Sequence, residues 1–62
     1  MQFVELITET YDNGTMHIAS VSKCSAQEKP KNIVEDMGDK HIGYHYFPTM
    51  AEAQRFIRYL KG

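Results

Sequence analysis

An aromatic strand pattern runs directly into an amphipathic helix pattern near the C-terminus, and this junction constrains the fold most. Pro48 cannot continue a strand ladder, so a strand over residues 40–47 has to end there. Thr49-Met50-Ala51-Glu52 matches a capping box, in which Glu52 reaches back to the amide of the cap residue. Apolar residues then recur at helical spacing, at Met50, Ala53, Phe56, Ile57 and Leu60. The rest of the chain therefore has to cover a C-terminal helix.

The N-terminal part of the chain predicts a β-hairpin. Residues 2–11 and 16–25 are rich in β-branched and aromatic side chains, and Asn13-Gly14 between them is a strong hairpin signal. A two-residue turn places Leu6 opposite Val21, whereas a three-residue loop ending at Gly14 exchanges the two faces of the second strand. The sequence leaves this register open. In either register Val4 and Leu6 form the cleaner apolar face, which we expect to meet the helix.

The middle of the chain is the least regular part. Residues 26–31 are polar around Pro30 and indicate a loop. Residues 32–38 fit either a loop with one helical turn ending at Gly38, which the spacing favours, or a short strand that turns at Met37-Gly38. The predicted fold is α+β: a three-stranded antiparallel sheet, made of the N-terminal hairpin and a third strand, with one C-terminal helix on one face. Its 62 residues form a single domain, 1–62.

Composition limits the classes of function. Seven basic and eight acidic residues give a net charge of −1, which attracts neither phosphate nor an anionic membrane. No apolar run is long enough to span a bilayer, and the N-terminus lacks the features of a signal peptide. Cys24 is the only cysteine, so no internal disulfide forms. We expect a cytoplasmic protein that makes no membrane contact.

Catalytic and metal sites are not indicated. His17, His41, His45 and Cys24 are the candidate ligands, but two histidines four residues apart on a strand lie about 13 Å from each other. That separation is too wide for one zinc ion with bonds of about 2 Å. Glu5 and Glu9 are equally far apart, and no phosphate-binding loop or nucleophile motif is present. We therefore expect no enzyme, no cofactor and no metal.

One local pattern points to nucleic acid. Phe47-x-Thr49-x-x-Glu52-Ala53 resembles the strand-to-helix joint of AP2-like integrase arm-binding domains, in which a three-stranded sheet enters a DNA groove. That resemblance implies a basic sheet, whereas the first hairpin here carries Glu5, Glu9 and Asp12. Phosphate contacts supply most non-specific affinity for DNA, so the remaining route to nucleic acid is the basic helix edge of Arg55, Arg58 and Lys61. Nucleic-acid binding is the alternative function.

The sheet face that does not meet the helix is the main candidate site. It keeps apolar and aromatic side chains, and contiguous apolar surface marks interfaces. We predict a small non-catalytic protein-binding module, an accessory regulator or inhibitor of a partner protein of the kind that phages and other mobile elements encode. A two-fold pairing of these faces would also thicken the small core, so we expect a homodimer. The predicted partner-binding residues are Phe3, Glu5, Ile7, Glu9, Tyr11, Tyr44, Tyr46, Arg55 and Arg58.

Overall fold

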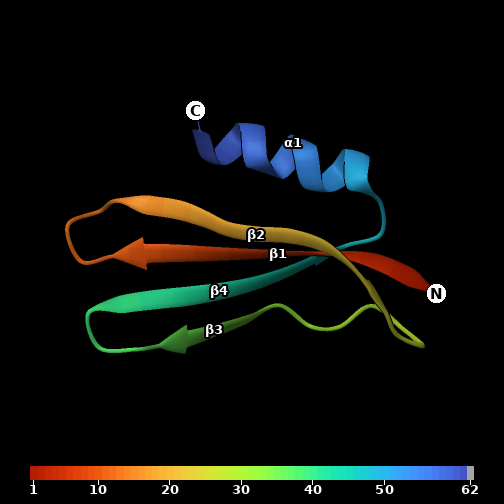
Figure 1. The fold of residues 1–62 in the computed structure, drawn as a ribbon, viewed down its shortest axis with the longest axis horizontal. Coiled ribbons are helices and arrows are strands. Elements are labelled where there is room, and N and C mark those ends of the chain that lie inside the picture. The colour runs from red at the N-terminus through yellow and green to blue at the C-terminus, as the bar shows by residue number, and fades with distance from the viewer. Residues whose placement is uncertain (62) are drawn as a thin grey trace.

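The computed structural model describes residues 1–61 and has the predicted α+β architecture (Figure 1). Its elements are β1 (Gln2–Tyr11), β2 (Met16–Ser25), β3 (Ile33–Asp36), β4 (Lys40–Phe47) and α1 (Met50–Lys61). The strands form one antiparallel sheet in the order β2-β1-β4-β3. The sheet therefore has four strands, one more than the sequence predicted. The two central strands are β1 and β4, and the helix packs against both.

The additional strand is β3, so the favoured interpretation of residues 32–38 as a loop with a helical turn was wrong. Ile33–Asp36 pairs with β4 and turns back at Met37-Gly38, as the alternative interpretation required. The Met37 amide donates to the Lys40 carbonyl at 2.8 Å, which closes a two-residue turn. Gly38 has φ of 90°, and a positive φ at the first of two turn residues is the type II′ pattern. Gly38 thus supplies the positive φ that this hairpin turn requires.

The first hairpin combines the two registers that the sequence left open. The Tyr11 amide donates to the Thr15 carbonyl at 2.8 Å around a three-residue loop, and Gly14 in that loop has φ of 88°. Beyond the loop the register shifts once, because Ala19 has no partner on β1 and forms a β-bulge. Because of the bulge, four β2 side chains face the helix side of the sheet: Met16 and Ile18 before it, and Val21 and Lys23 after it.

The core lies between α1 and the two central strands, and it is small. Leu6 and Ala53 are fully buried and Val4 is 4% exposed, which confirms that the Val4–Leu6 face meets the helix. The Phe56 ring packs on β4, with its centroid 5.1 Å from that of His45 and 5.3 Å from that of Phe47. Among the residues that the structure describes, no helix is long and apolar enough to cross a membrane.

Phe3 is buried at 7% exposure, although it belongs to the sheet face opposite the helix. Since β2 and β3 lie at opposite edges of the sheet, the connection 26–32 has to pass the end where Phe3 lies (Figure 1). Ala26 and Pro30 of this connection are half-buried. At the far edge the Asn32 side chain accepts a hydrogen bond from the Tyr46 amide at 3.0 Å. We attribute the burial of Phe3 to this crossing, which the sequence did not predict.

Candidate functional site

The sheet face opposite α1 brings six of the nine predicted partner-binding residues together, and we call it the open face. Glu5 lies opposite Tyr46, and Ile7 lies opposite Tyr44, across the β1–β4 pair. This register follows from the period of two along each strand. The open face consists of Glu5, Ile7, Glu9 and Tyr11 from β1, Lys40, Ile42, Tyr44 and Tyr46 from β4, Ile33 and Glu35 from β3, and His17, Ser20, Ser22 and Cys24 from β2.

The centre of the open face is apolar and only partly covered. Ile7, Ile42 and Tyr44 are half-buried, and Ile33 at the β3 edge is 54% exposed. By contrast, the buried apolar residues of the described chain are only Phe3, Val4, Leu6 and Ala53. Contiguous apolar surface of this kind usually marks a site of interaction with another macromolecule. A partner that covers the open face would therefore remove apolar surface from water.

Tyrosine hydroxyls hold both carboxylates of β1 in place on the open face. Tyr46 Oη donates to Glu5 Oε2 at 2.9 Å, and Tyr11 Oη donates to Glu9 Oε2 at 2.6 Å. The bond to Glu9 is the main reason that the pKa of Tyr11 is raised, and the bond to Glu5 raises the pKa of Tyr46 in the same way. Lys40 Nζ lies 4.0 Å from Glu9 Oε1. These bonds order the polar groups before any partner arrives.

Three predicted site residues do not join the open face. Phe3 lies on the same side of the sheet, but it is buried and offers no surface to a partner. Arg55 and Arg58 are exposed on α1, which covers the other side of the sheet. The nine residues predicted as one site therefore divide into a set of six on the open face, one core residue and two cations on the helix layer.

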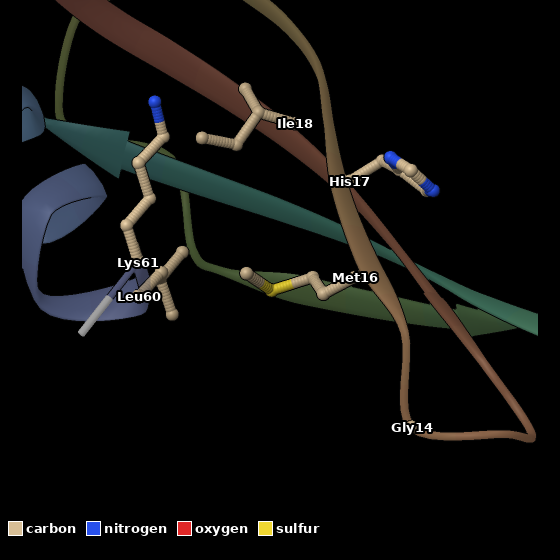
Figure 2. Close-up of a pocket in the computed structure, with 6 residues that line it drawn as sticks. All are labelled: Gly14, Met16, His17, Ile18, Leu60 and Lys61. Carbon is tan, nitrogen blue, oxygen red and sulfur yellow. The ribbon is translucent and has the colours of Figure 1, made fainter.

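A recess that the sequence did not predict lies on the other side of the sheet, where the C-terminal end of α1 approaches β2 (Figure 2). Met16 and Ile18 from β2 point toward Leu60 and Lys61 from α1, whereas His17 points away. The recess has a volume of about 520 Å³, and it adjoins a second one of about 220 Å³ that also includes Met16 and Leu60. The hairpin register was the missing signal, since it decides which face carries Met16 and Ile18.

The candidate metal ligands are divided between the two sides of the sheet. His41 and His45 lie on the helix side, and His17 and Cys24 lie on the open face. Within residues 1–61 no three His, Cys, Asp or Glu side chains are grouped so that they could hold a metal ion. His45 instead belongs to the helix–sheet interface, where its Nε2 lies 3.4 Å from Thr8 Oγ1. Burial there lowers the pKa of His45.

The comparisons with known proteins found no family model, curated protein or solved structure that matches this chain.

Proposed function

We propose that this protein is a non-catalytic, cytoplasmic binding module whose open face docks on a partner protein and regulates or inhibits it. The observation that carries this proposal is the half-exposed cluster of Ile7, Ile42, Tyr44 and Tyr46, flanked by the ordered carboxylates of Glu5 and Glu9. Aromatic residues in an apolar centre with polar groups at the rim are the usual composition of protein interfaces. Tyrosine in particular is enriched among the residues that dominate binding energy.

The area of the open face suits a small interface. A stable protein–protein contact buries about 800 Å² per partner, and the accessible surface of the described chain is 4542 Å². One sheet face of such a small domain can supply an area of that order. The homodimer predicted from the sequence would use the same face, so a second copy of the chain competes with a different protein as its occupant.

The proposal is tested by comparing two double variants with the wild-type protein in affinity purification from the cells that produce it. Ile7→Thr/Tyr44→Thr removes the apolar centre of the open face and keeps side chains that suit a strand. Arg55→Ser/Arg58→Ser removes two of the three exposed cations of α1 and is the matched control. We expect proteins that co-purify with the wild type to be lost with the open-face variant and kept with the helix variant.

The same variants test the nucleic-acid alternative, whose support is the exposed Arg55 and Arg58 on α1. Gel shifts at low salt, with generic duplex and single-stranded DNA, should show no binding if the protein-binding proposal is correct. Binding that Arg55→Ser/Arg58→Ser abolishes would replace it with a nucleic-acid function. Circular dichroism has to show native folding for both variants before either comparison is interpreted.

A further inference from the structure

Glu5 is the carboxylate of β1 that forms no salt bridge with a lysine or arginine of the described residues. Lys40 Nζ lies 4.0 Å from Glu9, on the same face and the same strand as Glu5. For Glu5, by contrast, no lysine or arginine nitrogen within residues 1–61 lies within 4.0 Å of its carboxylate. Its hydrogen bond comes from a neutral group, the Tyr46 hydroxyl, at 2.9 Å. The carboxylate of Glu5 is thus held in position by Tyr46 without a direct salt bridge.

The surroundings of Glu5 fit the side chain of an arginine from another molecule. Ile7 follows Glu5 on the open face, and Tyr44 lies directly opposite Ile7. Diagonal neighbours across two strands are within reach of long and aromatic side chains. The aliphatic stem of an arginine packs well on such a surface, and its planar guanidinium both stacks on aromatic rings and bonds to carboxylates. One carboxylate, one apolar side chain and one tyrosine ring therefore meet the three requirements of that side chain.

We propose that the open face binds a partner protein through an arginine whose guanidinium pairs with Glu5 and whose stem packs on Ile7 and Tyr44. This inference rests on the proposed function, because it names the chemistry of the partner at the same face. The strand residues of the open face include three carboxylates, Glu5, Glu9 and Glu35, and one cation, Lys40. Lys29 from the connection between β2 and β3 donates to the Tyr46 carbonyl at 3.3 Å, and the carboxylates still outnumber the two cations. Charge complementarity therefore favours a basic partner surface.

A second copy of the chain fits the open face less well. Each open face carries more glutamates than cations, so pairing two copies would leave uncompensated glutamates at the interface, which is costly. The two arginines, Arg55 and Arg58, belong to α1 on the other side of the sheet and cannot reach across to offset them. The occupant that the charges favour is thus a different protein.

The test is a titration of the ¹⁵N-labelled full chain with two tripeptides, followed by NMR. Acetyl-Leu-Arg-Leu-amide carries the proposed arginine, and acetyl-Leu-Gln-Leu-amide differs only in lacking the charge. We expect the arginine peptide to shift the amide signals of Glu5, Ile7, Tyr44 and Tyr46 at millimolar concentration. Its affinity should exceed that of the glutamine peptide about fivefold, the size of effect expected for a partly exposed ion pair.

Two matched variants show which carboxylate causes the preference for the arginine peptide. Glu5→Gln should abolish the difference between the two peptides, whereas Glu9→Gln, on the same strand and face, should keep it because Lys40 already lies beside Glu9. Equal affinities for the two peptides, shifts confined to other residues, no shifts at all, or a preference that survives Glu5→Gln would each overturn the proposal. A stable dimer in light scattering that Ile7→Thr/Tyr44→Thr dissociates would also overturn it, since a second copy would then occupy the face.

The same experiment separates this inference from the proposed function. If both peptides bind equally and Ile7→Thr/Tyr44→Thr abolishes both, the arginine pairing is wrong while the open face remains a docking surface. If partner proteins from the cell are kept by that double variant, the docking surface itself is wrong.

Discussion

The imidazole of His45 lies across the backbone of Gly43, two residues before it on the same face of β4. A Cβ atom added to Gly43 would lie 2.8 Å from His45 Nε2 and 2.7 Å from Thr8 Oγ1. Both distances are shorter than packed atoms adopt, so the absence of a side chain at residue 43 lets the His45–Thr8 pair form beneath α1. Overfilling such a site forces side chains off their preferred rotamers.

We therefore expect Gly43→Ala to lower the free energy of unfolding by about 1–3 kcal/mol. Urea denaturation followed by circular dichroism measures this change. In a His45→Ala background one of the two clashing groups is gone, so the same substitution should cost less there, and the double-mutant cycle should show coupling. A cost below about 0.5 kcal/mol in the wild-type background would contradict the close packing of residue 43.

Acid should destabilise the fold through His45. Burial under α1 lowers the pKa of His45 from its ordinary value of 6.5, so the unfolded chain binds the proton more readily than the folded chain. Stability should therefore be fully present above pH 6.5 and decrease as the pH falls below it. Urea unfolding at pH 7.5 and 5.0 should show a larger loss for the wild type than for His45→Gln. Equal losses would mean that other groups cause the acid sensitivity.

Leu6 should be the most sensitive position of the core. It is fully buried at the centre of β1, and deletion of such a side chain costs about 2–5 kcal/mol. Because a domain of this size seldom has more than about 3–5 kcal/mol in total, Leu6→Ala should be largely unfolded at 25 °C. Ile33→Ala is the matched control, since Ile33 is 54% exposed on β3 and should cost below about 1 kcal/mol. Similar unfolding midpoints for the two variants would contradict the assignment of the core.

Local chemistry made the two ends of the chain predictable. Gly14 can adopt a positive φ, and Pro48 followed by Thr49 favours the end of a strand and the start of a helix. The contrast between Val4 and Leu6 on one face and Glu5 and Glu9 on the other identified the side that meets α1. The six open-face residues followed from the same alternation, which depends only on strand period.

Non-local packing decided what the sequence could not show. Ile33-Val34 followed by two acidic residues fits one helical turn as well as a short strand. Pairing with the edge of β4 stabilises the strand. The bulge at Ala19 has no signal of its own, because Ala19 and Ser20 are equally acceptable on either face. The burial of Phe3 depends on β2 and β3 lying at opposite edges, a relationship that no local pattern contains.

The start of α1 provides a prediction about its cap. The Glu52 amide donates to Thr49 Oγ1 at 3.3 Å, and the Ala53 amide donates to the Thr49 carbonyl at 3.2 Å. Among residues 1–61 the reciprocal bond of the predicted capping box, from the Thr49 amide to the Glu52 carboxylate, is not formed. The structure thus shows a single side-chain cap rather than a complete box.

Removal of that cap should cost about 0.5–1 kcal/mol, the lower part of the usual range, because the bond to Oγ1 is long. Thr49→Ala tests this by urea denaturation, and Thr49→Ser, which keeps the hydroxyl, should stay within about 0.3 kcal/mol of the wild type. Glu52→Ala should also have a small effect, since the Glu52 carboxylate contributes only through the helix dipole. If Glu52→Ala instead costs as much as Thr49→Ala, the reciprocal bond forms in solution and the complete capping box is restored as the correct description.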